Sequence, residues 1–390
     1  APLGPVAVFG PNNFPFAFGS ISGGDFAAAI AAGNPVIAKA NSSHPGTTRI
    51  FAEEAFAAVE ETDLPSTAVQ LLYRTSHADG EQLVADPRIG ATAYTGSRRA
   101  GLTLKRAADQ AGKPIYLELS SVNPVVLLPG ALVARCDELI DEFCTSALMG
   151  TGQFCTNPGL VLLLAGDVTD RFVQGVAQRY TSTTAGTLLS RAVQQSLQES
   201  VKVLHNAGAD LYAGAEETEQ SRYCVGNSLL VATATQFLAD DETFQVEAFG
   251  NASLFVIAEN VAQLRTVLQR LEGNLTGCIY SDVDGADDDA YRQLAPLLRQ
   301  KVGRLLNDKM PTGVAVSPAM NHGGPYPSTG HPGFTAVGIP ASLHRFAMLQ
   351  CFDAVRSDRL PPELRDENPN RTMWRLVDGE WTQQDLSLIH

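Results

Sequence analysis

Gly150-Thr-Gly-Gln-Phe-Cys-Thr-Asn-Pro-Gly159 places one cysteine, Cys155, in a polar loop made of turn-forming residues. A helix-like run (residues 137–148) precedes this loop, and an apolar strand-like run (residues 160–164) follows it. Glycines in such a loop let the backbone approach a ligand closely. A cysteine is often a small buried hydrophobe, but the polar neighbours here do not form a core. A reactive thiol and a buried thiol are therefore equally good interpretations of this stretch alone.

On both sides of this loop, strand-like and helix-like runs alternate with short connections. We expect strands at residues 6–9, 36–39, 69–73, 91–94 and 115–119, with helices at 25–32, 47–61, 78–85 and 97–109. A second alternating section starts near Pro124 and ends with a strand at 304–306. Such alternation is typical of an α/β fold with a doubly wound parallel sheet. Ligands of these sheets bind at the carboxyl ends of the strands.

Composition excludes several classes of protein. With 390 residues, 44% hydrophobic and 18% charged, the chain can form large cores. The formal net charge of -14 argues against nucleic acid or an anionic membrane as the main partner. Six cysteines show no CxxC pair and no metal-like spacing with the seven histidines, so we expect no metal site. Free thiols favour a reducing compartment, which we take to be the cytoplasm.

Polar residues follow the first two predicted strands. Asn13 could donate its side-chain amide to a developing oxyanion, although a turn asparagine more often satisfies its own backbone. Lys39 ends the second strand, from which a lysine can reach a phosphate or a ribose, and Ser42 lies three residues further on. A solvated lysine at the edge of the sheet is the alternative.

Three further motifs are ambiguous when each is taken alone. Thr95-Gly-Ser-Arg-Arg-Ala-Gly101 joins a strand to a helix, so Gly96 and Ser97 could form an anion site or an ordinary helix cap. Glu118 ends the fifth strand among apolar neighbours, as a general base or a salt-bridge partner would. Glu247 and Phe249 precede a glycine turn, where they could contact a ribose and a flat ring or cover a core.

The order of these motifs is similar to that in the aldehyde dehydrogenase superfamily. Asn-Phe-Pro, Lys, Thr-Gly-Ser-x-x-x-Gly, Glu-Leu, Gly-Gln-x-Cys and Glu-x-Phe-Gly follow one another across essentially the whole chain. The resemblance implies an aldehyde dehydrogenase-like α/β fold. It assigns residues 1–122 to an NAD(P)-binding domain that lacks its N-terminal part, 123–340 to a catalytic domain, and 341–390 to an oligomerisation strand and tail. It also implies a homodimer or homotetramer.

The same resemblance gives each residue a role. Cys155 is the nucleophile that attacks the aldehyde, Asn13 and the Cys155 backbone N–H hold the oxyanion, and Glu118 activates the water that releases the acid. Phe16, Phe154 and Phe334 would line an apolar substrate channel. The implied contacts to the cofactor come from Phe9, Gly10, Lys39, Ser42, Gly96, Ser97, Leu119, Glu247 and Phe249.

Three stretches resemble the 2-oxoglutarate semialdehyde (2,5-dioxovalerate) dehydrogenase branch: residues 150–159, residues 321–329 (Asn-His-Gly-Gly-Pro-Tyr-Pro-Ser-Thr) and residues 360–364. The fatty aldehyde branch shares the first, so a fatty or medium-chain aldehyde is the alternative substrate. Relatives that prefer NAD usually carry glutamate three residues after the lysine. Ser42 stands there instead, which favours NADP and leaves NAD possible.

Other classes of function remain open at this point. A cysteine hydrolase or acyltransferase needs a histidine beside Cys155, and His322 is the only histidine in a suitable loop. A CoA-acylating relative would have no need of Glu118 to activate water. An inactive structural homologue would have no need of any of these residues.

Overall fold

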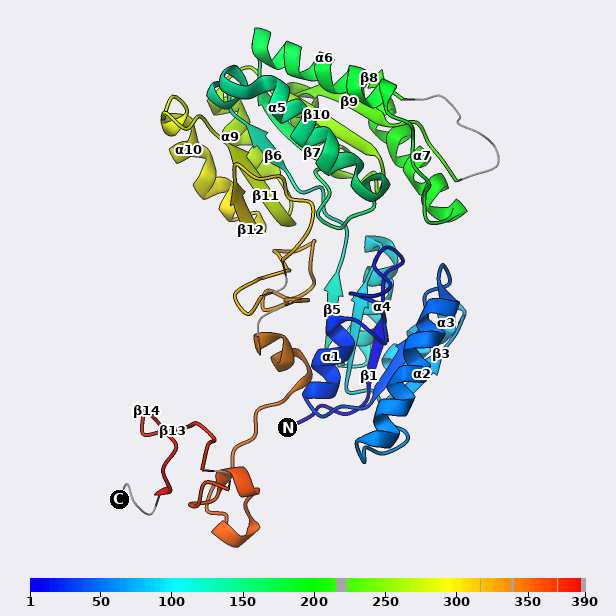
Figure 1. Ribbon diagram of the computed structural model, residues 1–390, viewed down its shortest axis with the longest axis vertical. Helices are drawn as coiled ribbons and strands as arrows, with labels where there is room; N and C mark the ends of the chain where they lie inside the picture. The colour runs from blue at the N-terminus through cyan, green and yellow to red at the C-terminus, as the bar shows by residue number, and fades with distance from the viewer. Residues whose placement is uncertain (215–222, 316, 338–339, 370, 387–390) are drawn as a thin grey trace. The chain divides into compact units, whose positions relative to one another are not determined.

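The computed structural model of the chain describes residues 1–214, 223–315, 317–337, 340–369 and 371–386 (Figure 1). It divides into two units. Pro2–Ala347 form the larger unit, and Met348–His390 with Ala1 form the smaller. All candidate site residues named above lie in the larger unit. No described helix has both the length and the apolar character that crossing a membrane requires.

The first sheet of the larger unit has five parallel strands in the order β3-β2-β1-β4-β5. Side chains of β1 alternate between its two faces. Val6 and Val8 pack with α1 and α2, whereas Ala7 and Phe9 pack with α3 and α4. The sheet is therefore doubly wound, with its carboxyl edge free to bind a ligand. The bounds are β1 Val6–Phe9, α1 Gly24–Ala31, β2 Val36–Lys39, α2 Pro45–Glu61, β3 Val69–Leu72, α3 His77–Ala85, β4 Ala91–Thr95, α4 Arg98–Gln110 and β5 Ile115–Glu118.

The second sheet has seven strands in the order β12-β11-β6-β7-β10-β9-β8, parallel except for β8. Helices α5 and α6 cover one face, and α7 to α10 cover the other (Figure 1). The strands are β6 Val125–Leu127, β7 Leu160–Leu164, β8 Asp210–Ala213, β9 Ser228–Thr233, β10 Ala252–Ala258, β11 Asn274–Tyr280 and β12 Val302–Asn307. The helices are α5 Pro129–Leu148, α6 Asp167–Ser182, α7 Arg191–Asn206, α8 Ala234–Ala239, α9 Val261–Arg270 and α10 Asp288–Arg299.

The α/β architecture expected from the alternating pattern is confirmed, and the differences are local. The short strands β6 and β8 have three and four residues, too few to show a period. Helix α5 begins eight residues before the predicted start, and α2 begins at Pro45 rather than at residue 47. Each starts with proline, whose fixed φ suits the first helical turn.

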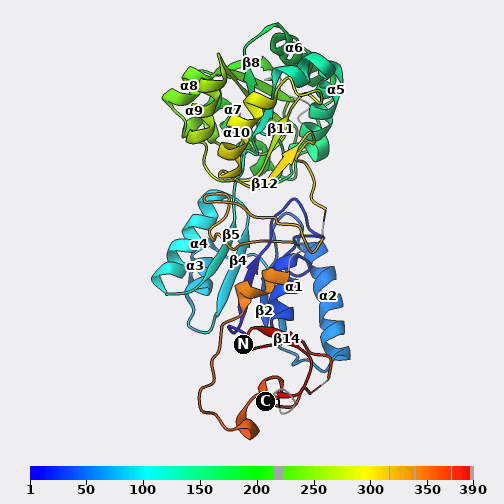
Figure 2. The same ribbon diagram turned by 90° about the vertical axis from the view of Figure 1, so that its left-hand side faces the viewer.

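After β12 the chain returns to the first sheet in irregular backbone. Thr329 forms an isolated bridge with Glu118, and the N–H of Leu119 donates to the carbonyl of Ser328 at 2.8 Å. Figure 2 shows this segment passing beside the end of β5. It continues into the 3₁₀ segment Pro340–Phe346, and Phe346 packs in the core between the first sheet and helices α1 and α2. Residues of this return segment thus lie next to the carboxyl edge of the first sheet.

The smaller unit holds the 3₁₀ turns Ser357–Arg359 and Pro362–Leu364 and the hairpin of β13 Arg375–Val377 with β14 Glu380–Thr382. Asn368 braces the hairpin, because its amide donates to the carbonyls of Met373 and Gln383 at 2.8 and 2.9 Å.

Candidate active site

The loop that carries Cys155 starts with a turn that requires glycine. Helix α5 ends at Leu148, and the 3₁₀ turn Met149–Gly152 follows. Gly150, Thr151 and Gly152 all have left-handed backbone, with φ of 56°, 59° and 67°. A Cβ on Gly152 would lie 2.0 Å from the carbonyl oxygen of Gly250. Glycine there lets this turn rest directly on the Glu-x-Phe-Gly motif.

A buried asparagine holds the backbone on the other side of the cysteine. The amide of Asn123 donates to the carbonyls of Cys155 and Asn157, at 2.9 Å each. Its oxygen accepts from the hydroxyls of Ser121 at 2.8 Å and Thr276 at 3.0 Å. Asn123 therefore fixes the position of Cys155 relative to the second sheet. Sequence reasoning missed it, although an asparagine inside an otherwise apolar run was the available signal.

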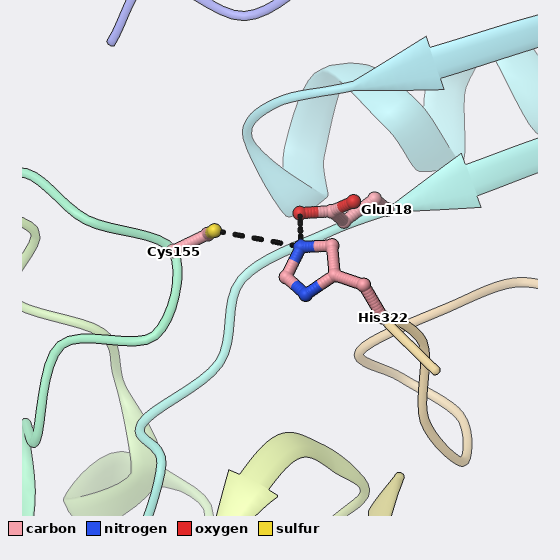
Figure 3. Close-up of side chains that lie close together, drawn as sticks. All are labelled: Glu118, Cys155 and His322. Carbon is pink, nitrogen blue, oxygen red and sulfur yellow. Dashed lines mark hydrogen bonds and ion pairs between the residues drawn. The ribbon is translucent and has the colours of Figure 1, made fainter. Parts of the chain in front are cut away.

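Three side chains from distant parts of the sequence meet at one point (Figure 3). Glu118 ends β5, Cys155 follows the 3₁₀ turn, and His322 belongs to the segment after β12. Nε2 of His322 lies 3.0 Å from Oε1 of Glu118 and 3.6 Å from Sγ of Cys155. The side chains of His322 and Glu118 are only 1% and 2% exposed. One imidazole nitrogen thus contacts both the carboxylate and the thiol away from bulk water.

The charges around this point act on one another. Burial raises the pKa of the Cys155 thiol, His322 opposes that rise, and Glu118 and Glu247 add to it. Burial alone would lower the pKa of His322, but the negative charges of Glu118 and Cys155 outweigh it and raise that pKa well above its ordinary value. A protonated His322 is therefore stabilised beside Glu118, and its charge lessens, without reversing, the rise in the pKa of Cys155.

Glu247 forms a second acidic group beside this point. Burial raises its pKa to about 7, with a smaller contribution from Glu118, while hydrogen bonds from the Ser120 hydroxyl and the Ser121 N–H oppose the rise. Glu247, Phe249, Gly152 and Phe154 also line one cavity. The Glu-x-Phe-Gly motif and the cysteine loop thus line the same cavity.

The loop after β1 contacts the cysteine loop. The side chain of Asn13 donates one N–H to the carbonyl of Gln153 at 2.9 Å, two residues before Cys155. The rings of Phe14 and Phe154 pack edge to face with centroids 4.9 Å apart. Asn13 keeps a second amide hydrogen for another acceptor. The two sheets thus contribute to one site.

The aromatic residues expected in a substrate channel have different surroundings. Phe154 lies against Phe14 in the cysteine loop. Phe16 is 69% exposed and packs against Phe51 of α2, and Phe334 is buried beneath the guanidinium of Arg345. Phe18, which the sequence did not single out, lies 5.7 Å from the ring of His322.

The residues expected to bind a cofactor lie along the carboxyl edge of the first sheet, except Glu247 and Phe249, which precede β10 of the second sheet. Phe9 at the end of β1 pairs in register with Lys39 at the end of β2, and Gly10 accepts a hydrogen bond from Asn41 at 3.2 Å. Ser97 stands at the N-cap of α4 without a side-chain cap bond, so the first N–H groups of this helix stay available to an anion. Burial lowers the pKa of Lys39.

Close packing brings α4 against β5 behind this edge. A Cβ on Gly101 would lie 2.4 Å from Cδ2 of Leu119. Glycine therefore lets the N-terminal turn of α4 approach the end of β5, where Glu118 lies.

Residues 1–305 match the family model described as "Aldehyde dehydrogenase family". The chain belongs to the aldehyde dehydrogenase family. Alpha-ketoglutaric semialdehyde dehydrogenase 2 of Azospirillum brasilense is 41% identical over 97% of this chain and 71% of its own length. An alpha-ketoglutaric semialdehyde dehydrogenase of Acinetobacter baylyi is 36% identical over 98% of this chain and 72% of its own length.

Solved structures share the fold at lower identity. The glyceraldehyde-3-phosphate dehydrogenase GapN of Methanocaldococcus jannaschii, solved with NADP, superposes with a TM-score of 0.72 at 19% identity, over 88% of this chain and 71% of that one. A lactaldehyde dehydrogenase superposes equally well, with a TM-score of 0.72 at 20% identity over 88% of this chain and 69% of that one.

Membership of the aldehyde dehydrogenase family confirms the resemblance seen in the motifs and makes the chain an oxidoreductase that acts on aldehydes. The roles of individual residues stay predictions. Among the residues with predicted roles, the structure brings Cys155, Glu118, Asn13 and Glu247 to one place. It adds His322, which sequence reasoning considered only as the base of a hydrolase.

Proposed function

We propose that the chain oxidises 2,5-dioxovalerate to 2-oxoglutarate with NADP, through a thioester on Cys155. The observation that carries this proposal is the contact of His322 with both Cys155 and Glu118, because it supplies a nucleophile, a cation and a base in one buried place. The two relatives named above are alpha-ketoglutaric semialdehyde dehydrogenases. Alpha-ketoglutaric semialdehyde is another name for 2,5-dioxovalerate.

In the first step the Cys155 thiolate attacks the aldehyde carbon. A C–S bond forms, and the carbonyl electron pair moves to oxygen. The free amide hydrogen of Asn13 and the backbone N–H of Cys155 are the proposed donors to this oxyanion. Protonated His322 lowers the cost of forming the thiolate before attack, since Nε2 lies 3.6 Å from Sγ.

Glu247 and Phe249 would hold a nicotinamide cofactor, which would supply the hydride acceptor. Loss of hydride from the tetrahedral carbon would leave an acyl group on Cys155. Glu118 then takes a proton from water, and the resulting hydroxide attacks the thioester. The carboxylic acid leaves and Cys155 returns to the thiolate. His322 holds Oε1 of Glu118, and Oε2 is buried with no hydrogen-bond partner among the described residues. This second oxygen is the one we assign to the water.

The carboxyl edge of the first sheet fits a dinucleotide. The uncapped start of α4 supplies N–H groups for the pyrophosphate, Lys39 a cation for a ribose or phosphate, and Glu247 and Phe249 contacts to the nicotinamide half. Ser42 carries no negative charge to repel a ribose 2′-phosphate, and Arg74 follows the neighbouring strand β3. These features support NADP, with NAD as the alternative.

An acidic substrate needs a cation, and Arg304 of β12 is the residue we propose. Its Nη2 donates to the carbonyls of Pro311 and Gly313 at 3.2 Å each, while its Nε has no hydrogen-bond partner among the described residues. No described carboxylate forms a salt bridge with it. The N–H of Gly313 donates to Oγ1 of Thr156, beside the nucleophile, at 3.2 Å. Burial lowers the pKa of Arg304 and the negative charge on Cys155 opposes this.

A second candidate is acyl transfer by a cysteine and histidine without any cofactor, because Cys155 and His322 are in contact. Membership of the aldehyde dehydrogenase family favours oxidation.

Of the substrates for oxidation, a medium-chain aldehyde is favoured over the dioxo acid only by the aromatic contacts around Phe154. Assembly into a homodimer or homotetramer and a cytoplasmic location remain predictions of the sequence.

The test is to incubate the purified chain with 2,5-dioxovalerate or with pentanal and to monitor the reduction of NADP and of NAD by absorbance. We expect reduction with the dioxo acid and NADP, and none in Cys155→Ala. Reduction with pentanal but not with the dioxo acid would support the alternative substrate. Release of acid from an activated ester, without reduction of either cofactor in any assay, would support acyl transfer.

A further inference from the structure

The three side chains at the centre of the site also have the composition and spacing of a metal site. We propose that Sγ of Cys155, Nε2 of His322 and a carboxylate oxygen of Glu118 bind Zn²⁺ or a similar borderline-soft divalent ion, and that the bound ion stops aldehyde oxidation. The three ligand atoms lie within 4.8 Å of one another, and among the described residues they form the only such group.

Two of the three separations are close to those around a tetrahedral ion. Zinc binds cysteine sulfur at about 2.3 Å, histidine nitrogen at about 2.0–2.1 Å and carboxylate oxygen at about 2.0–2.2 Å, which separates neighbouring ligand atoms by about 3.3–3.6 Å. Nε2 of His322 lies 3.6 Å from Sγ of Cys155 and 3.0 Å from Oε1 of Glu118. Small side-chain rotations would therefore make room for an ion between them (Figure 3).

An unsatisfied oxygen points to a missing ligand at this place. Glu118 is 2% exposed, and its Oε2 has no hydrogen-bond partner among the described residues. A buried carboxylate oxygen without a partner is costly. Either a catalytic water or a metal ion would give Oε2 a partner. The two cannot occupy this position at the same time.

The ligand types select the kind of ion. Thiolate and imidazole favour Zn²⁺, Co²⁺ or Cd²⁺ over Mg²⁺ and Ca²⁺, which prefer oxygen ligands. One thiolate and one carboxylate also balance the charge of a divalent ion in a buried site, and the ion replaces the proton on Nε2 of His322, which is released to solvent. Cys155 itself is half-buried rather than enclosed, so an ion can enter from the side on which the aldehyde must approach.

Binding of the ion and catalysis exclude each other. Binding to the ion lowers the nucleophilicity of Sγ and places the ion in the path of the aldehyde, and a metal-bound Glu118 no longer accepts a proton from water. Inhibition is therefore expected to be reversible by a chelator. The inhibitory part of this inference rests on the proposed function, whereas the binding part stands on geometry alone.

The experiment is titration of the full chain with Co²⁺, which reports coordination directly in its visible spectrum. We expect one equivalent of tetrahedral cobalt with a thiolate-to-cobalt charge-transfer band, displaced by Zn²⁺ and not by Mg²⁺. His322→Gln and Cys155→Ser should each weaken binding by at least about 10- to 100-fold, which is the scale for disturbing a metal site. Cys351→Ser is the matched control, because Cys351 is an exposed free cysteine in the smaller unit.

Two outcomes would overturn the inference. One is a six-coordinate cobalt spectrum without a thiolate band. The other is unchanged tetrahedral binding in His322→Gln, which would show that another group of ligands holds the ion. Glu118→Gln provides a second variant should His322→Gln fail to fold, as judged by circular dichroism. The cobalt spectra decide the matter even if no substrate is oxidised, so failure of the proposed function is distinguishable from failure of this site.

Discussion

Replacing Arg304 with glutamine tests which aldehyde the site recognises. The change removes a positive charge from β12 and leaves a shorter side chain that is still polar. A hydrogen bond to a charged group contributes about 1.5–3 kcal/mol. If Arg304 binds the carboxylate of the substrate, kcat/KM for 2,5-dioxovalerate should therefore fall by about 10- to 150-fold. Most of this loss should appear in KM, because the carboxylate is bound equally before and during the reaction.

Pentanal is the comparison substrate, since it has the same number of carbons and no carboxylate. Its kcat/KM should change by less than about threefold. Arg304→Lys should keep part of the preference, because the charge remains while the paired geometry of the guanidinium is lost. Lys301→Gln is a matched control, since Lys301 directly precedes the same strand and donates to the carbonyl of Gln269 instead.

A structural role for Arg304 would give a different result. Its two bonds to the carbonyls of Pro311 and Gly313 brace the turn after β12. If bracing were its whole function, Arg304→Gln would lower kcat/KM for both aldehydes by similar factors and would lower Tm. Equal losses with the two substrates would therefore refute the reasoning about the carboxylate.

Three further predictions concern the chemistry of the site. Asn13→Ala should lower kcat by two to three decades, the scale of about 2.7–4 kcal/mol for one oxyanion donor, with a smaller effect on substrate KM; an unchanged kcat would remove Asn13 from this role. Ser42→Glu should shift the ratio of kcat/KM for NADP over NAD by at least about tenfold toward NAD, because a carboxylate repels the 2′-phosphate; a constant ratio would show that the selectivity lies elsewhere. His322→Gln should slow alkylation of Cys155 by iodoacetamide at neutral pH by about tenfold or more, since removing the cation disfavours the thiolate. Mass spectrometry can follow Cys155 with exposed Cys351 as the internal control, and equal rates before and after the change would contradict it.

The carboxyl edge of the first sheet was predictable because its signals are local. Each of β1, β2, β4 and β5 is a short buried run followed by a polar or glycine-rich loop, and parallel strands bring those loops to one edge. Lys39, Ser97 and Glu118 could thus be placed together from sequence alone. Cys155 was equally visible as a candidate nucleophile, because its loop contains residues that do not form a core.

His322 could not be placed in the same way. It lies 167 residues after Cys155 and 204 after Glu118, in a segment without regular structure. No local period connects such a segment to a strand end. Its position depends on contacts between distant parts of the chain. The N–H of Leu119 donates to the carbonyl of Ser328, and the N–H of Gly330 donates to the carbonyl of Leu117 in β5. Asn123 was missed for a related reason. Its role depends on hydrogen bonds to the carbonyls of Cys155 and Asn157, which lie more than 30 residues later in the sequence.

Because the chain returns from β12 to β5, contacts with both sheets hold the residues of the site in place. Asn123 and Gly152 fix the cysteine loop to the second sheet, and Asn13 also links it to the loop after β1 of the first sheet. Glu118 belongs to the first sheet, and the segment that carries His322 is tied to that same strand end through Thr329. His322 is consequently the side chain that joins the two halves electrostatically, through one nitrogen that contacts both anions. The same segment is also tied to the second sheet, because the side chain of Asn321 donates to the carbonyl of Gly303 at 3.3 Å. A shift between the sheets would therefore disturb the contacts of Nε2 with both Glu118 and Cys155, and with them both steps of the proposed reaction.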